Sequence, residues 1–305
     1  MQKLSKKILA PDNLRLAWEE VFDSRGGPGS DGITLRRWGR NWEENLVALR
    51  RDVLSSRYRP APPKTFTIPK KGGGLRLLAV LTVTDRVLQR AVLRVVDDIF
   101  DATFLDCSYG YRAGRGVRQA LPAILSHRDS GRQWVLDADI DDCFHSLDHR
   151  LLMDRFGERV DDDVVQGLIW SWLDSGRPEP DRPVGIPMGA VLSPLLCNIF
   201  LHPLDIALVR NGFHPIRYAD DFCVFCHSRQ QLTRAAEATT IKLSDLKLRL
   251  EPTKTHRTHF DKGFDFLGIH FCRHSYSFTA NMKRIEVEGA FDPRLFYDYV
   301  PDGYE

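Results

Sequence analysis

The chain has 305 residues, of which 43% are hydrophobic and 28% are charged. This length and composition are typical of a folded protein of one or two domains and exclude a chain that is disordered throughout. No stretch approaches the roughly 18 uninterrupted apolar residues of a membrane span, and the lysine-rich first residues lack an apolar signal core, so we expect a cytoplasmic protein without a membrane partner.

The charge is unevenly distributed, although the formal net charge is only +2. Residues 1–135 hold 24 Lys and Arg against 14 Asp and Glu, whereas residues 136–305 hold 19 against 27. A basic half suits contact with phosphate backbones, and an acidic half with clustered aspartates suits divalent metal ions. Charge by itself leaves a nucleic-acid partner undecided, because most protein surfaces are charged.

The six cysteines have neither the spacing of a disulfide framework nor that of a four-ligand zinc module. Cys223 and Cys226 form a single CxxC motif, but a strand would direct the two side chains to opposite faces. We therefore expect core cysteines here rather than a metal or redox pair.

The periodicity of apolar residues predicts helices and strands that alternate without the period of a repeat protein, which indicates the α+β class. In chain order, helices are expected within 11–57 around a glycine-rich loop at 26–32, at 84–100, after the turn-rich segment 109–116, and at 148–175, 190–209 and 229–247. Strands are expected at 65–69 and 75–81 around a basic turn, at 134–140, in a hairpin at 215–226, and at 256–260 and 264–271.

Two adjacent carboxylates, Asp220 and Asp221, interrupt an otherwise apolar run. Uncompensated charges beside a core are costly, so metal ions or cationic partners are the natural reason to keep them in a hairpin turn. Asp139 ends another apolar strand, and the three carboxylates converge if the strands are sheet neighbours. They would then hold two Mg²⁺ ions for an in-line phosphoryl transfer. Taken alone, either acidic group is also compatible with a solvated turn.

A series of motifs follows in a fixed order along the chain. They are Ile68-Pro69-Lys70 with Gly73 and Arg76, Asp85–Gln89, Tyr109-Gly110-Tyr111-Arg112, Ala138-Asp139-Ile140 through Phe144, Gly185–Leu196, Tyr218-Ala219-Asp220-Asp221, Leu248–Thr255 and Phe264–Gly268. Over roughly residues 58–271 the sequence resembles the reverse transcriptases, and within them the bacterial group II intron-like branch. A lone YxDD tetrapeptide is weak evidence, whereas this ordered series is specific.

The resemblance implies a right-hand polymerase whose antiparallel palm sheet packs on helices. Residues 1–57 would form an N-terminal helical extension, 58–135 the fingers, and 136–271 the palm, with a fingers-palm segment near 176–209. Residues 272–305 would be the start of a thumb or a linker, because they are too few for a full helical thumb. A protein partner, a fused module or a structured RNA would then replace a thumb that is only rudimentary.

The resemblance also assigns roles to individual residues. Asp139, Asp220 and Asp221 would be catalytic and would bind two Mg²⁺ ions, for which Mn²⁺ could substitute, with the Ile140 carbonyl as a further ligand. Phe144 would pack under the sugar and exclude a 2′-hydroxyl, so that dNTPs are preferred. The residues expected to bind the nucleotide are Lys70, Arg76, Ile140, Phe144, Met188, Gly189 and Lys254, and those expected to position template and primer are Tyr111, Arg112 and Arg115.

Four positions leave their roles open. Lys254 could protonate pyrophosphate, or it could be a solvated surface lysine. Met188 stands where group II relatives usually carry Gln, which removes a hydrogen-bonding amide and puts nucleotide preference in question. Asp141 and Asp142 stand where relatives often carry Lys, Ser or Gly, and we expect both to face solvent rather than to tune the local field.

The sequence therefore predicts an RNA-directed DNA polymerase that uses an RNA template, a DNA or RNA primer and dNTPs, in a bacterial CRISPR or phage-defence system. The block ending Leu192-Ser193-Pro194 differs from that of diversity-generating enzymes, and retron signatures are not seen, while a stand-alone group II-like enzyme stays open. One alternative is template-independent or protein-primed DNA synthesis in antiviral defence. Another is a catalytically silent nucleic-acid-binding scaffold, which the retained aspartates and Phe144 disfavour.

Overall fold

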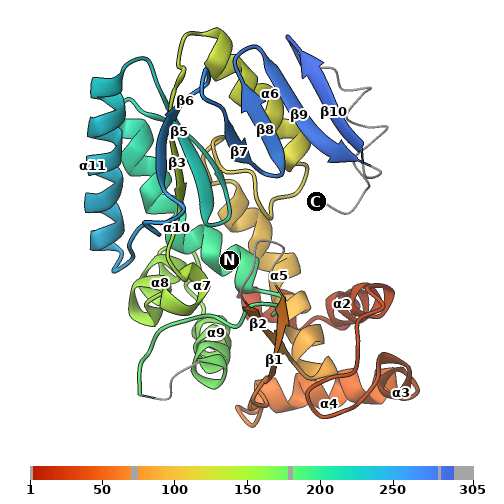
Figure 1. Cartoon of the computed structure of the whole chain (residues 1–305). Coiled ribbons are helices and arrows are strands. Elements are labelled where there is room, and N and C mark those ends of the chain that lie inside the picture. The colour runs from red at the N-terminus through yellow and green to blue at the C-terminus, as the bar shows by residue number, and fades with distance from the viewer. Residues whose placement is uncertain (1–2, 70–74, 178–180, 281–282, 292–305) are drawn as a thin grey trace. The chain divides into compact units, whose positions relative to one another are not determined.

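The computed structural model describes residues 3–69, 75–177, 181–280 and 283–291 (Figure 1). The chain divides into two compact units, each of which combines two segments that are far apart in sequence. The first unit comprises residues 1–103 and 144–200, and the second comprises residues 104–143 and 201–305. Within the described residues, every helix is too short or too polar to span a lipid bilayer.

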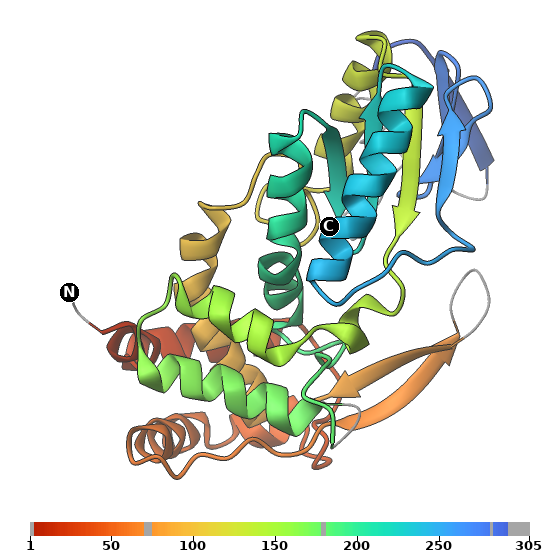
Figure 2. The same cartoon turned by 90° about the vertical axis from the view of Figure 1, so that its left-hand side faces the viewer.

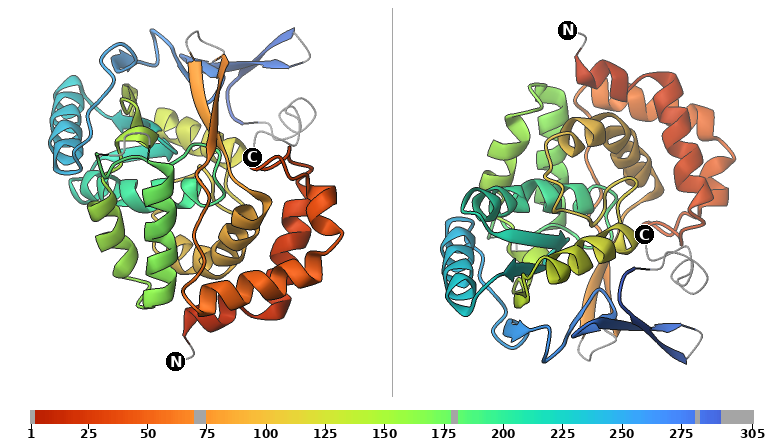
Figure 3. Two further views of the ribbon diagram at one scale, coloured as in Figure 1. Left: turned by 90° about the horizontal axis from the view of Figure 1, so that it is seen from below. Right: turned by 90° about the horizontal axis from the view of Figure 1, so that it is seen from above.

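In the first unit, N-terminal helices pack against one long helix, α5 (Val83–Asp101). Thr82 caps this helix by accepting a hydrogen bond from the backbone N–H of Asp85, and apolar residues at helical spacing bury the side of α5 that faces its neighbours. Figure 3 shows the red and orange N-terminal helices beside α5. The other helices of this region are α1 (Leu4–Ile8), α2 (Pro11–Asp23), α3 (Leu35–Gly39), α4 (Trp42–Leu54), α7 (Cys143–Ser146), α8 (His149–Gly157) and α9 (Asp163–Gly176).

The single helix expected over 148–175 is wrong, because the structure has two helices there, α8 and α9. The Asp162 side chain accepts hydrogen bonds from the backbone N–H groups of Val164 and Val165 and so starts a new helix. Its other carboxylate oxygen accepts the backbone N–H of Ser5 over 2.8 Å. This second bond comes from a distant part of the chain, which local periodicity does not reveal.

The first unit also carries a two-stranded antiparallel hairpin of β1 (Lys64–Pro69) and β2 (Leu75–Val80). Both strands were expected from the sequence. Most side chains of β1 are exposed, so the hairpin extends from the helical body rather than forming part of its core. The connecting basic turn, residues 70–74, lies outside the described residues.

The second unit is built on a four-stranded antiparallel sheet in the order β4-β5-β3-β6. Its strands are β3 (Trp134–Asp139), β4 (His214–Tyr218), β5 (Asp221–Cys226) and β6 (His256–His259). Figure 2 shows α10 (Ser193–Arg210) and α11 (Arg229–Asp245) on one face of this sheet and α6 (Val117–Asp129) on the other. Because side chains alternate along a strand, Asp137 and Asp139 point to the α6 face and Leu136 and Ala138 to the α11 face.

A second antiparallel sheet follows in the order β10-β9-β8-β7. The strand expected over 264–271 is instead a tight hairpin of β7 (Phe264–Phe266) and β8 (Ile269–Cys272), because Leu267 and Gly268 both have positive φ, at 55° and 75°. The sequence did not predict β9 (Ser275–Ala280) or β10 (Lys283–Glu288). Side chains of this sheet, including Phe271, join Phe225 of β5 and residues of α6 in one buried cluster.

Candidate active site

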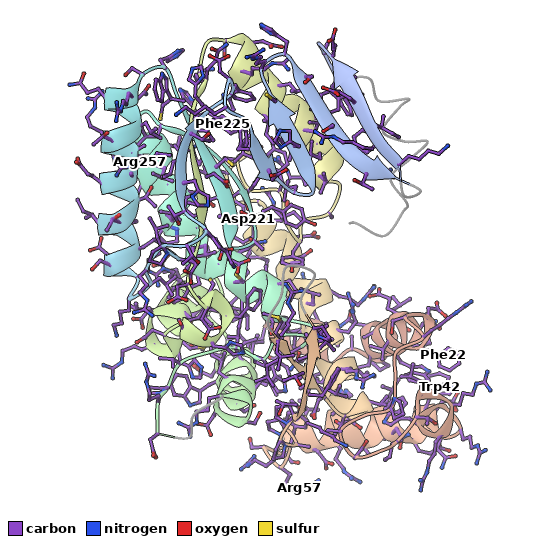
Figure 4. The ribbon with its side chains drawn as sticks, viewed as in Figure 1. Phe22, Trp42, Arg57, Asp221, Phe225 and Arg257 are labelled. Atoms are coloured by element: carbon purple, nitrogen blue, oxygen red, sulfur yellow. The ribbon has the colours of Figure 1, made fainter. Side chains whose placement is uncertain are left out.

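Four aspartates lie together at one end of the four-stranded sheet. Asp139, the last residue of β3, pairs directly with Asp221, the first residue of β5. Directly opposed residues of antiparallel strands share a face, so these two carboxylates project to the same side, with Asp137 two residues earlier in β3. Asp220 lies in the turn that joins β4 to β5. Figure 4 shows Asp221 and Phe225 toward opposite ends of β5.

The clustering makes full ionisation of these carboxyl groups unfavourable. Burial, with added repulsion from Asp137, Asp139 and Asp220, raises the pKa of Asp221 to about 8. Burial also raises the pKa of Asp137 to about 6. A cation that binds here would relieve the repulsion and stabilise the ionised carboxylates. The electrostatics therefore favour a bound cation.

Lys254 brings a positive charge to this cluster. Its Nζ donates a hydrogen bond to Oδ2 of Asp139 over 2.7 Å. This hydrogen bond raises the pKa of Lys254, so the amine stays protonated. The lysine that the sequence placed near the site therefore contacts one of the three carboxylates expected to bind metal.

The segment 249–251 holds the end of β3 in place. The Glu251 N–H donates to the Asp139 carbonyl over 2.9 Å, and the Asp141 N–H donates to the Arg249 carbonyl over 3.0 Å. In this pattern the backbone N–H and C=O of Ile140 point away from the partner segment. The Ile140 carbonyl is thus oriented away from this ladder, as a metal ligand would have to be.

The expectation that Asp141 and Asp142 both face solvent is half right. Asp142 is exposed. Asp141 is half-buried, and its Oδ2 accepts a hydrogen bond from Nε of Arg249 over 2.7 Å and forms an ion pair with Nη2 of Arg249 at 2.6 Å. Arg249 is far away in sequence, so only the folded chain could reveal this partner. The ion pair fastens the loop after Asp139 to the segment that precedes Lys254.

The donor set of the cluster fits a hard divalent cation such as Mg²⁺, because it consists of carboxylate and carbonyl oxygens. Among the residues that the structure describes, no three His, Cys, Asp or Glu side chains enclose a single metal position by themselves. Mg²⁺ commonly binds one or two carboxylates and completes its shell with water and substrate phosphates. The residues therefore fit a site that a nucleotide would complete.

A cleft of about 560 Å³ adjoins the carboxylates. Asp137, Asp139 and Asp221 line this cleft together with Lys254 and His256. Such a cleft offers carboxylates that can bind cations next to a lysine that can contact a phosphate, which suits the end of a polyanionic chain.

Met188 and Gly189 lie in the first unit, where they are joined to β2. The Ala79 N–H donates to the Met188 carbonyl over 2.7 Å. Ala79 and Met188 line a cavity of about 270 Å³. Gly189 has φ +100°, and a Cβ atom there would lie 2.9 Å from the Ala79 carbonyl oxygen. Only glycine permits this conformation and this close approach.

The remaining nucleotide residues are placed as follows. Phe144 is buried in the first unit, and its carbonyl accepts a hydrogen bond from the Ile186 N–H over 2.7 Å. Arg76 is exposed on β2, opposite Ile68. Lys70 lies outside the described residues. The roles of these three residues toward a nucleotide stay predictions.

The loop 107–116 contains the three residues expected to position template and primer. Tyr111 is 50% exposed, and its ring centroid lies 6.1 Å from that of Tyr218, next to the aspartate turn. Arg112 is buried and donates to two carbonyls, one of them that of Ser108. Arg115 pairs with Asp106, which directly precedes the loop. The geometry suits Tyr111 for stacking on a base, whereas the described bonds of both arginines order the loop itself.

The sequence did not single out Asp137 or the buried pair of Asp205 and Arg217. The available signal for Asp137 is its position two residues before Asp139, which places both side chains on one face of β3. The signal for Arg217 is an arginine inside an apolar strand, directly before Tyr218. Its partner Asp205 lies on α10 and carries no local signal.

A protein-family model described as "Reverse transcriptase (RNA-dependent DNA polymerase)" matches residues 68–271. The chain belongs to the reverse transcriptase family. Each residue that we assign to metal, nucleotide, template or primer falls within the matched region. The family and the α+β fold expected from the sequence are thereby confirmed.

Several known proteins are similar to the chain. Protein YkfC of Escherichia coli K12 is 30% identical over 318 residues, which cover 90% of this chain and 84% of YkfC. The group II intron-encoded protein LtrA of Lactococcus lactis is 30% identical over 208 residues, so that 67% of this chain matches 34% of LtrA. The telomerase structure of Candida albicans has a TM-score of 0.56 at 12% identity over 81% of this chain and 50% of the telomerase, which shows a shared fold.

Proposed function

We propose that this reverse transcriptase extends a primer with dNTPs on an RNA template, and that Asp139, Asp220 and Asp221 bind two Mg²⁺ ions at its active site. The observation that carries this proposal is the direct pairing of Asp139 with Asp221 across β3 and β5, with Asp220 in the adjoining turn. Bound there, divalent ions would supply Lewis-acid stabilisation to the attacking 3′-hydroxyl and to the leaving pyrophosphate.

In this proposal, side chains of the protein position the metal-binding carboxylates and the nucleotide, and Lys254 supplies a positive charge. The register of β3 and β5 keeps the carboxylates of Asp139 and Asp221 on one face. Lys254, which donates to Asp139, is close enough to the cluster to donate to a phosphate oxygen instead. Tyr111 would stack on a base beside the turn. Phe144 would exclude the ribose 2′-hydroxyl by packing, which selects dNTPs.

Primer extension tests this proposal directly. The wild-type chain is incubated with Mg²⁺, dNTPs and an RNA template annealed to a DNA primer, in parallel with arms that lack template or contain rNTPs. We expect template-dependent DNA. Asp221→Asn should lower the rate about 10³-fold or more, because it removes several kcal/mol of charge stabilisation. The control Asp245→Asn alters an exposed aspartate of α11 that pairs with Lys242 and should match wild type.

The same experiment separates the alternatives. Products of equal yield and unrelated sequence with and without template would indicate template-independent synthesis. Binding of the RNA–DNA duplex without extension by the wild type would indicate a scaffold and would end the polymerase proposal.

We further propose a role in a bacterial CRISPR or phage-defence system, with a protein partner, a fused module or a structured RNA completing the grip on the duplex. This part of the proposal is supported by the sequence motifs alone. Purification of the chain from its native cells, followed by identification of the bound proteins and nucleic acids, would test it. Co-purification with intron RNA only would contradict a defence role.

A further inference from the structure

A buried arginine lies directly behind the aspartate turn. Arg217 is in β4 opposite Phe222, which places its side chain on the face of the sheet away from Asp139 and Asp221. Its guanidinium donates from Nε and Nη2 to the two carboxylate oxygens of Asp205 over 2.8 and 2.6 Å. Both side chains are only 1% exposed. This is a bidentate ion pair between the sheet and helix α10.

The same guanidinium reaches the turn. Nη1 of Arg217 donates to the carbonyl of Ala219 over 2.9 Å, and Nη2 donates to the hydroxyl of Ser108 over 2.9 Å. Ala219 has φ +58°, which is uncommon for a residue with a side chain. The bond to its carbonyl therefore holds a strained residue that immediately precedes Asp220.

A second contact holds the turn from the loop 107–116. The Arg217 N–H donates to the Cys107 carbonyl, and the Tyr109 N–H donates to the Arg217 carbonyl, each over 2.8 Å. Gly110 then lies so close to the turn that a Cβ atom on it would be 2.6 Å from the backbone nitrogen of Ala219. The turn is thus confined by a side chain on one side and by backbone on the other.

A gain in folding stability does not by itself explain the buried Asp205–Arg217 ion pair. Removing two charges from water costs several kcal/mol, and apolar residues of similar volume often stabilise a core equally well or better. A bidentate pair does fix direction, because the planar guanidinium fork allows one geometry. The direction fixed here is that of the Ala219 carbonyl, and hence of the turn that carries Asp220 and leads into Asp221.

We propose that Asp205, Arg217, Ser108 and Gly110 form a positioning cradle that holds the Tyr218–Asp221 turn in the geometry needed to bind divalent metal ions. None of the four is catalytic, since the cradle acts through the turn. The inference rests on the proposed metal-binding function of Asp220 and Asp221. It predicts that metal affinity depends on residues that do not bind the metal themselves, including the Asp205–Arg217 pair on the opposite face of the sheet.

The test compares Mn²⁺ binding, measured by electron paramagnetic resonance, in the wild type and in Asp205→Leu/Arg217→Met. The double substitution replaces both charges with apolar side chains, so the protein can stay folded, which circular dichroism and thermal unfolding will check. Loss of groups that orient metal ligands commonly lowers affinity about 10- to 100-fold, and we expect a decrease of this size. The Mg²⁺ concentration needed for half-maximal primer extension should rise in parallel.

Arg128→Met is the matched control. Arg128 is also a buried, ion-paired arginine of the second unit, but it bonds to Asp129 and to the Gly289 carbonyl. Its loss should lower thermal stability and leave Mn²⁺ affinity unchanged. A folded double variant with wild-type Mn²⁺ affinity would overturn the cradle, as would an equal loss of affinity in Arg128→Met.

Gly110→Ala provides a second route if the double variant does not fold. Its new methyl group would press on Ala219 without removing any charge, and it should lower Mn²⁺ affinity; unchanged affinity would overturn the proposal. The two proposals fail separately. If Asp221→Asn abolishes Mn²⁺ binding while the wild type extends no primer, the polymerase proposal fails, and the Mn²⁺ affinities of the variants still decide the cradle.

Discussion

Replacing Lys254 with methionine tests whether this lysine donates to the leaving pyrophosphate or is only a counter-ion of Asp139. Lys254 Nζ lies 2.7 Å from Asp139 Oδ2, and the two side chains are 60% and 22% exposed. An ion pair this accessible to water contributes only about 0.2–1 kcal/mol to folding. Lys254→Met should therefore change the free energy of unfolding by less than about 1 kcal/mol, so a larger effect on catalysis will not come from misfolding.

The expected effect on rate is much larger. Negative charge accumulates on the leaving pyrophosphate during nucleotidyl transfer, and an ammonium that donates to it forms a charge-assisted hydrogen bond. Hydrogen bonds to charged groups contribute about 1.5–3 kcal/mol. Lys254→Met should therefore lower the rate about 10- to 150-fold. Lys254→Arg keeps the charge and should lose less.

Single-turnover primer extension at saturating dNTP, repeated across a Mg²⁺ titration, measures this effect. Lys242→Met is the control, because Lys242 also forms an accessible ion pair with an aspartate, Asp245, but on α11. A different result would refute the reasoning. If Lys254→Met extends at the wild-type rate and needs less Mg²⁺, the lysine is only a counter-ion that competes with metal for Asp139.

Three further predictions concern stability, measured by urea unfolding. Gly189→Ala should cost about 1–3 kcal/mol from backbone strain alone, because φ is +100° and the new Cβ would lie 2.9 Å from the Ala79 carbonyl oxygen; wild-type stability would contradict the close approach. Tyr58→Phe should cost about 1–3 kcal/mol, since the hydroxyl donates to buried Asp85 over 2.6 Å; no loss would show that water replaces it. Burial lowers the pKa of His127 to about 4, so the unfolded chain binds a proton that the folded chain resists, and stability should fall by up to about 3 kcal/mol as the pH drops from 6.5 to 4. His127→Phe should reduce this dependence of stability on pH. An unchanged dependence would show that other groups cause it.

Much of the fold could be predicted because its signals are local. Helical spacing predicted α5 and α11, and runs of apolar, strand-favouring residues predicted β3 and the β4–β5 hairpin. The prediction of one helix over 148–175 failed because a hydrogen bond from the Ser5 N–H to Asp162 supports the break between α8 and α9. The prediction of one strand over 264–271 failed because positive φ angles at Leu267 and Gly268 reverse the chain inside an apolar run.

The sequence by itself predicted which residues should carry the chemistry. Asp139, Asp220 and Asp221 stand at the ends of apolar strands, where a charge without a ligand would be costly, and the ordered motifs around them identify a reverse transcriptase.

Only the tertiary structure decided how these charges are held. Lys254 meets Asp139 across 115 residues of sequence, and Arg249 meets Asp141 across 108. Arg217 binds Asp205 on a helix that packs behind the sheet. Contacts between distant segments depend on strand register and on packing, and neither is encoded in the pattern of any one segment.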